Sequence, residues 1–111
     1  MIVANRTLMM KDGERTIPIA ITIFAPEKTA AGDWGCRYLI DWPERPSDKT
    51  IFGFDSIQAL HGALQIVGAE IYSSDYHEAG NLFWEAPGKG YGFPVAPTLR
   101  DLLIGDDAKY F

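Results

Sequence analysis

Hydrophobic and polar residues alternate along the first half of the chain, as they do in half-buried β-strands. In RTIPIAITIFA the four isoleucines fall on one face, while Pro18 and the two threonines fall on the other. The preceding stretch, IVANRTLMM, predicts a second strand, and the Asp12-Gly13 pair between them favours a tight hairpin turn. Because proline has no N–H to donate, Pro18 predicts an edge strand or an outward-facing position.

The stretch DWGCRYLIDW alternates in the same way and predicts a third strand. One of its faces carries a thiol among large apolar groups: Trp34, Cys36, Tyr38, Ile40 and Trp42. The two prolines of PERPSD predict a loop, after which KTIFGF can form a fourth strand. The four strands together predict an antiparallel meander with one apolar face.

The apolar period changes to three and four over residues 55–72, which predicts an amphipathic α-helix lying on the sheet. Asp55 is a good N-cap, and Gln58 three residues later completes a capping-box pattern. Five aliphatic residues form the stripe that is expected to face the sheet: Ile57, Leu60, Leu64, Val67 and Ile71.

A second stripe on this helix consists of four small or apolar residues: Ala59, Gly62, Ile66 and Ala69. A helix face in water usually carries charged residues, whereas this segment holds only Asp55 and Glu70. Small residues let another backbone approach closely, so we expect something to pack there. Two occupants remain open, the chain's own C-terminal segment and a second subunit. We favour the first, because a chain covers its own surfaces before it covers another's.

Downstream of the helix, SSDYHEAG is expected to be a polar loop and NLFWEA a fifth strand. APTLRDLLIG predicts a short helix with Thr98 as N-cap and Gly105 as terminator, and DDAKYF a tail. The whole chain, 1–111, predicts one α+β domain. It has an antiparallel sheet of four to five strands with one long helix on a face, in the order β-β-β-β-α-β, and a short C-terminal helix.

Charge and composition exclude several classes of function. The formal net charge is -5 and no basic stripe is present, which argues against nucleic-acid binding. No apolar run approaches the ~20 residues of a membrane helix, so we expect no membrane partner. The single cysteine rules out an internal disulfide framework and fits a reducing cytoplasm. The start, MIVANRTLMM, lacks a signal-peptide pattern, so we expect a cytoplasmic protein.

Residues 88–94, GKGYGFP, form a glycine-rich stretch that we call the glycine turn. A Walker phosphate loop needs G-x-x-x-x-G-K-[ST], and a dinucleotide fingerprint needs G-x-G-x-x-G; neither spacing fits. We interpret the stretch as backbone that needs positive φ angles and lets Tyr91 and Phe93 insert. An anion on the N-terminus of the short helix near Thr98 stays open as an alternative.

No metal or catalytic constellation stands out. Cys36, His61 and His77 lie in no C-x-x-C or H-x-x-x-H pair, and His77 is expected to be solvated among the acids of DYHE. Cys36 shares a strand face with aromatic residues, which predicts a buried, inert thiol. We therefore expect no metal, no cofactor and no catalytic residue.

Three stretches, GDWGCRYLIDWP, FGFDSIQALHGALQIVGAEIY and GKGYGFPVAPTLRDLL, resemble a family of small bacterial proteins of unknown function. The resemblance covers nearly the whole chain and implies a bacterial, cytosolic, stand-alone domain. It implies no activity, cofactor or catalytic residue. By analogy of context, some small acidic bacterial domains act as immunity proteins beside secreted toxins.

Two functions follow as predictions. The preferred one is a non-catalytic protein-interaction module that binds a protein partner or a second copy of itself. Its surface would be the small-residue helix stripe, Ala59, Gly62, Ile66 and Ala69, or an aromatic sheet patch with Trp34 and Trp42. The alternative is a small-molecule- or anion-binding domain, or a small enzyme, with a pocket between the helix, the glycine turn and the sheet. That pocket would use His61, Trp84, Lys89 and Tyr91, with His61 as its acid or base.

Overall fold

The first hairpin forms where the Asp12-Gly13 pair predicts it. In the computed structural model, which describes residues 1–111, strands β1 (Ile2–Asp12) and β2 (Arg15–Phe24) pair antiparallel. Gly13 adopts a φ of 65°, the left-handed conformation that such a turn requires. A register shift between Ile2 and Ala4 bends the far end of the hairpin.

Six strands form one antiparallel sheet, where the alternating pattern predicts a sheet of four to five strands. Besides β1 and β2, these are β3 (Glu27–Lys28), β4 (Trp34–Ile40), β5 (Ser47–Gly53) and β6 (Leu82–Phe83). Two of them, β3 and β6, are only two residues long. The order is β3-β4-β2-β1-β6, and β5 pairs along the length of β4. β2 is therefore an inner strand. Pro18 pairs with Met9 of β1 but lies beyond the short β2–β4 ladder, so its missing N–H costs no bond to β4.

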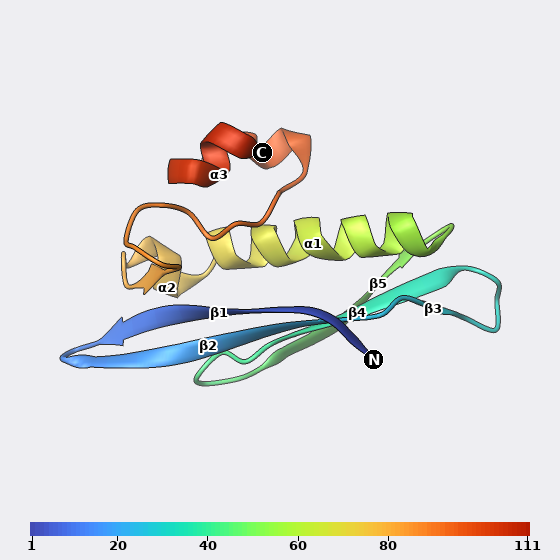
Figure 1. Cartoon of the computed structure of the whole chain (residues 1–111), viewed down its shortest axis with the longest axis horizontal. Coiled ribbons are helices and arrows are strands. Elements are labelled where there is room, and N and C mark those ends of the chain that lie inside the picture. The colour runs from blue at the N-terminus through green and yellow to red at the C-terminus, as the bar shows by residue number, and fades with distance from the viewer.

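All helices lie on one side of this sheet, and its other face is bare (Figure 1). The long helix α1 (Ser56–Tyr72) lies directly on the sheet, with the short helix α2 (Asp75–Glu78) beside it. The C-terminal segment passes over α1 on the side away from the sheet. It carries the 3-10 helix η1 (Pro97–Leu102) and the helix α3 (Gly105–Tyr110). The predicted α+β class, with one main helix on a face, is confirmed.

The N-terminus of α1 is capped as the sequence predicts. Asp55 accepts a hydrogen bond from the Gln58 N–H at 2.8 Å, and Gln58 Oε1 accepts one from the Phe54 N–H at 2.6 Å. The expected buried stripe is partly wrong, however, because Ile57 is 75% exposed. The residues of α1 that the core buries fully are Ala59, Ala63, Val67 and Ile71.

Small residues on α1 explain why the helix presents Ala59 and Ala63, and not Ile57, to the sheet. Ala59 sits so close to β5 that a Cβ on Gly53 would lie 2.6 Å from the Ala59 nitrogen. A Cβ on Gly62 would lie 3.2 Å from Ile51 Cγ2, so this glycine also faces β5. The helix therefore approaches the sheet through alanine and glycine, and the larger Leu60 and Leu64 are left half-buried at the flank.

The side of α1 that faces away from the sheet is covered by the chain's own C-terminal segment. This segment was the favoured occupant in the sequence analysis. The contact is made at Gly68, where an added Cβ would collide with the Pro94 carbonyl, and at Tyr72. Neither residue belongs to the small-residue stripe that was predicted to receive it. Ile66 of that stripe remains 41% exposed.

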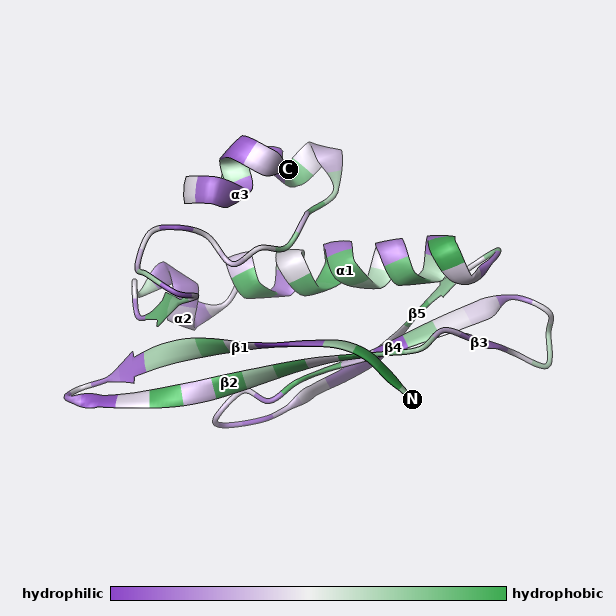
Figure 2. Cartoon of the chain, in the orientation of Figure 1, coloured by the Kyte–Doolittle hydropathy of each residue, from purple (hydrophilic) through white to green (hydrophobic).

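The C-terminal third departs most from expectation. The short helix begins at Pro97 after Ala96 and has no side-chain cap, so Thr98 is not an N-cap. Gly105 opens α3 instead of ending a helix. Only glycine suits this position, because its φ is 55° and it packs closely on Lys89. Asp75–Glu78 form α2 with Ser74 as its N-cap, and the predicted fifth strand shrinks to β6. Figure 2 shows why α3 looked like a tail, since its residues are mostly hydrophilic.

Candidate functional site

The glycine turn has the backbone that its three glycines predict. Gly88, Gly90 and Gly92 have φ angles of 78°, 90° and 76°. The two aromatic residues between and after them insert as expected, because Tyr91 is 2% exposed and Phe93 is 5% exposed. The turn therefore brings main-chain N–H groups and ring edges into the space between α1 and the C-terminal segment.

These N–H groups bind an anion, and the anion is the chain's own Asp107. Its carboxylate accepts hydrogen bonds from the Tyr91 N–H and the Gly92 N–H, each at 2.7 Å. The Tyr72 hydroxyl donates a third at 2.5 Å. A Cβ on Gly90 would lie 2.5 Å from the Asp107 Cγ, so only glycine leaves room for the carboxylate. Asp107 is 2% exposed and fixes α3 to the body of the domain.

Two tyrosines and a histidine surround this carboxylate. Burial, with a smaller effect of the Asp107 charge, raises the pKa of Tyr91 to about 12. Burial and the hydrogen bond to Asp107 likewise raise the pKa of Tyr72. The Tyr91 hydroxyl lies 2.5 Å from His77 Nδ1, so His77 is not the solvated loop residue that was expected. Burial lowers the pKa of His77, which favours the neutral imidazole.

Arg6 reaches the same turn from the sheet. Its Nη1 donates to the carbonyl oxygens of Gly92 at 2.7 Å and Tyr91 at 3.2 Å. The guanidinium carbon lies 4.0 Å from the Trp84 ring centroid and 5.0 Å from that of Phe93. Burial lowers the pKa of Arg6, while the Asp107 charge opposes that shift, and the group stays cationic.

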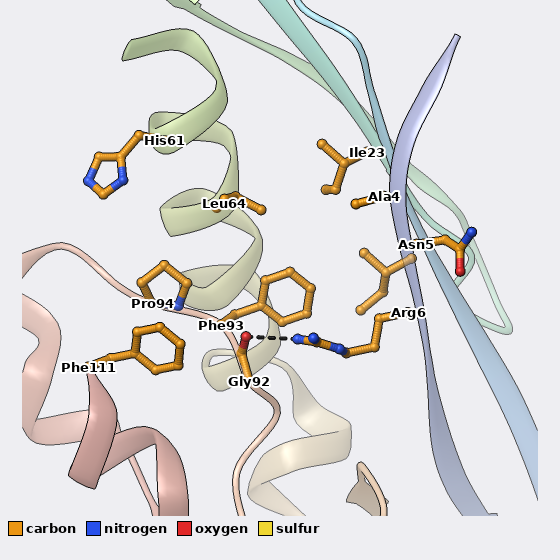
Figure 3. A pocket seen from close by; sticks show the side chains of 11 residues that line it. Ala4, Asn5, Arg6, Ile23, His61, Leu64, Gly92, Phe93, Pro94 and Phe111 are labelled. Atoms are coloured by element: carbon orange, nitrogen blue, oxygen red, sulfur yellow. Dashed lines mark hydrogen bonds between the residues drawn. The ribbon is translucent and has the colours of Figure 1, made fainter. Parts of the chain in front are cut away.

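An apolar pocket opens beside Arg6, between α1, the glycine turn and the sheet. Its volume is about 460 Å³. We call it the apolar pocket. Figure 3 shows Arg6 extending from β1 toward Gly92, with the Phe93 ring beside it and His61 on the opposite side of the view. Its walls comprise Ala4, Asn5, Arg6, Ile21, Ile23, His61, Leu64, Gly92, Phe93, Pro94 and Phe111.

A second cavity of about 690 Å³ lies on the other side of the glycine turn, and we call it the charged pocket. It shares Arg6, Gly92 and Phe111 with the apolar pocket. Its remaining walls are mostly charged or aromatic: Trp84, Glu85, Ala86, Lys89, Asp106, Asp107 and Tyr110. Three carboxylates face two cations there, whereas Arg6 is the one charged side chain in the walls of the apolar pocket.

The four residues of the predicted small-molecule site do not meet at one point. His61 lines the apolar pocket, while Trp84 and Lys89 line the charged pocket. Tyr91 is buried beneath the turn and lines neither. The position expected for the pocket, between helix, turn and sheet, is nevertheless the position of the apolar pocket.

The residues of the predicted partner surface are also dispersed. Ala59 is fully buried against the sheet, so it cannot contact a partner, and Gly62 faces Ile51. Ala69 is half-buried, and Ile66 is the one stripe residue that is exposed. Trp34 and Trp42 are both half-buried. Trp42 stacks on Tyr76 at 5.1 Å, which leaves little of its ring for another molecule.

Glu70 was noted in the sequence only as one of the two charges of the helix, but it joins the helix to the sheet. Its carboxylate accepts hydrogen bonds from Tyr38 at 2.6 Å, Trp42 at 2.9 Å and Ser47 at 2.8 Å, and Lys49 lies at 3.4 Å. Burial acts to raise the pKa of Glu70, but these donors outweigh it and the pKa lies below its usual value. This carboxylate is engaged through both of its oxygens and joins α1 to β4 and β5.

Arg6 and Asp107 are the site residues that sequence reasoning missed. Period two places Arg6 on the same strand face as the buried Leu8 and Met10, and a charge on an inward face is a usable signal. Asp107 gave no comparable signal, since it stands among acidic and polar neighbours. No group of three or more histidine, cysteine, aspartate or glutamate residues is placed to hold a metal ion.

The fold and site define an open-faced α+β domain with a pocket beside its glycine turn. The chain belongs to the family described as a domain of unknown function, DUF6968, whose model matches residues 4–95. This match confirms the resemblance to a family of unknown function. No curated protein and no solved structure matches the chain. The matched residues include Arg6 and the glycine turn, while Asp107 and Phe111 lie beyond them. None of the helices has the length and apolar character that crossing a bilayer demands.

Proposed function

We propose that the domain binds a small molecule in the apolar pocket and performs no chemistry on it. The observation that carries this proposal is the cavity of about 460 Å³ at the junction of α1, the glycine turn and the sheet. Ligand sites typically measure about 300–1,000 Å³ and combine apolar walls with a few polar groups. The apolar pocket has that composition, with Arg6 and His61 as its polar side chains, while the side chain of Asn5 points away from it (Figure 3).

The placement of the candidate reactive groups supports a binding role over a catalytic one. The Cys36 thiol is fully buried and donates to the Phe24 carbonyl oxygen at 3.3 Å. Burial also raises its pKa, which disfavours the nucleophilic thiolate. His61 is exposed, and no carboxylate or hydroxyl group forms a hydrogen bond with its ring, although an acid–base pair would need such a partner.

A fragment screen by thermal shift tests the proposal, with two variants that separate the pocket from the rest of the surface. Ala4→Phe places a ring in the apolar pocket, because Ala4 lines it from β1. Val3→Phe adds the same ring to a neighbouring position that does not line the pocket. Fragments should raise the Tm of the wild type and of Val3→Phe, but not of Ala4→Phe. Equal stabilisation of all three proteins would contradict the proposal.

A protein-interaction module is the second candidate, and a specific surface favours it. Phe54 is 90% exposed and Ile57, three residues later, is 75% exposed, where β5 leads into α1. Exposed apolar residues that together form one patch often mark contacts with a protein partner or a second copy. Sedimentation of wild type and of Ile57→Asp tests self-association. A monomer at every concentration would contradict the version with a second copy of the chain.

A bacterial, cytoplasmic setting belongs to the same proposal. The one cysteine is buried and unpaired, as a reducing compartment would permit. An immunity-like role beside a toxin rests on analogy of context, and a toxin-like reading frame next to the gene would support it.

A further inference from the structure

The guanidinium of Arg6 keeps one edge free. Nη1 is engaged by the Gly92 and Tyr91 carbonyl oxygens, but neither Nε nor Nη2 donates to any protein acceptor. No carboxylate lies within salt-bridge distance of Arg6, since the two ion pairs of the domain are Arg37–Asp48 and Lys49–Glu70. The free edge is the one that binds a carboxylate or phosphate with two parallel hydrogen bonds.

Asp107, the nearest candidate counter-ion, is committed elsewhere. Its Oδ2 accepts from the Tyr72 hydroxyl and the Tyr91 N–H, and its Oδ1 accepts from the Gly92 N–H. These neutral donors satisfy the carboxylate without the guanidinium. Arg6 is thus a half-buried cation that no protein anion neutralises directly.

Aromatic rings hold the guanidinium in place. Trp84 and Phe93 both lie within cation–π distance, and the two carbonyl bonds fix the rotation of the Nη1 end. A side chain fixed in this way loses little conformational entropy when a ligand pairs with its free edge.

The walls of the apolar pocket offer a surface for the apolar part of a ligand. Arg6 is the one charged side chain among them, and most of the others are aliphatic or aromatic. An apolar body can bury its surface there while a single anionic head meets the guanidinium. The charged pocket suits such a ligand poorly, because Glu85, Asp106 and Asp107 would repel its head.

Building on the proposed binding function, we propose that the apolar pocket takes an amphiphilic acid. Its carboxylate or phosphate head pairs with the Nε and Nη2 edge of Arg6, and its apolar body lies against Ile23, Leu64 and Phe93. Carboxylate and phosphate share this chemistry, so both head groups are compared in the test.

Calorimetric titration with four probes of eight carbons each tests the head group: sodium octanoate, octyl phosphate, octan-1-ol and octylammonium chloride. At least one of the two anions should bind wild type about tenfold or more tightly than octan-1-ol, and octylammonium should bind most weakly. The stronger of octanoate and octyl phosphate identifies the natural head. Equal affinity for the anions and the alcohol would overturn the proposal and leave the pocket itself standing. No binding of any probe by wild type would overturn it as well.

Variants of Arg6 complete the test. Arg6→Gln should lose about tenfold or more of its affinity for the anionic probe and keep its affinity for octan-1-ol. Arg6→Lys, which keeps the charge but not the fork, should fall between wild type and Arg6→Gln. Arg15→Gln, at an exposed position on β2, is the matched control and should bind like wild type. Unchanged anion binding in Arg6→Lys and Arg6→Gln would overturn the proposal. The fragment screen with Ala4→Phe separates this failure from a failure of the pocket.

Discussion

The two pockets meet at Arg6, Gly92 and Phe111, yet their walls are chemically opposite. The apolar pocket is walled mainly by residues of the sheet, α1 and the glycine turn. The charged pocket is walled largely by the C-terminal segment and by the loop around Trp84. The same guanidinium is therefore presented to an apolar space on one side and to three carboxylates on the other.

The groups beside Arg6 decide which ligand each pocket can bind. The affinity of a ligand depends on what else must be desolvated beside the cation, and not on the cation alone. In the apolar pocket an anionic head gains the charge of Arg6, and its body gains burial. In the charged pocket the same head meets Glu85, Asp106 and Asp107, which repel it.

The largest effect is expected from Asp107, which fixes the C-terminal walls of both pockets. Asp107→Ala removes the acceptor of two buried N–H groups and of the Tyr72 hydroxyl. The variant should lose about 3 kcal/mol or more of unfolding free energy in urea titrations. Asp106→Ala, at the exposed neighbouring position, is the control and should stay within about 0.5 kcal/mol of wild type. A loss as small in Asp107→Ala as in the control would show that α3 is held by other contacts.

Two glycine variants test whether the glycine turn needs glycine to make room for the Asp107 carboxylate. Gly90→Ala combines a positive φ with a Cβ placed 2.5 Å from the Asp107 Cγ. Gly88→Ala has a similar φ but meets no heavy atom within 4 Å. We expect losses of about 3 kcal/mol for the first and about 1 kcal/mol for the second in chemical denaturation. Equal losses would mean that backbone strain alone, and not the carboxylate, requires glycine at position 90.

A smaller effect is expected in the pH dependence of the unfolding free energy, through His77, whose ring contacts the Tyr91 hydroxyl. Burial lowers the pKa of His77 in the folded state from the ordinary value of 6.5. The unfolded chain then takes up the proton first, so this contribution to stability is complete above pH 6.5 and is lost as pH falls below it. Unfolding free energies between pH 7.5 and pH 5.5 should fall less in His77→Gln than in wild type. An identical fall in both would contradict the lowered pKa.

The smallest effect is expected from Lys89, which lines the charged pocket and not the apolar one. Lys89→Gln should leave the affinity for the preferred anionic octyl probe within about twofold of wild type, because charges outside the pocket are screened by water. Calorimetric titration measures it. A loss as large as that of Arg6→Gln would place the ligand in the charged pocket and reverse the comparison.

Much of the sheet could be predicted from the sequence, because alternation directly reports which face of a strand is buried. The isoleucines of β2 and the inward row of β4 lie where period two places them. The position of α1 on the sheet was harder. In the sequence pattern Ile57 extends the apolar stripe. In the structure the close approach of Ala59 to Gly53 orients the helix so that Ile57 is exposed. Hydrophobicity does not encode such a contact, since it depends on the absence of a Cβ.

The candidate site could be predicted only in outline. The three glycines indicated positive φ angles and inserted rings, and the pocket lies between the elements that were expected to enclose it. Asp107 could not be found, because its partners are main-chain N–H groups, which every residue except proline carries. A pairing between residue 107 and the turn at 90–92 also depends on how η1 and α3 fold back, and periodicity carries no information about that path.

Residue-level NMR is the most direct test that a ligand occupies the apolar pocket. Methyl and amide spectra of the wild-type protein would be recorded during titration with sodium octanoate and octyl phosphate. We expect the largest shifts at Ala4, Ile23 and Leu64, with smaller shifts at Lys89 and Glu85 across the turn. Shifts confined to the charged pocket, or gathered around Phe54 and Ile57, would contradict the account.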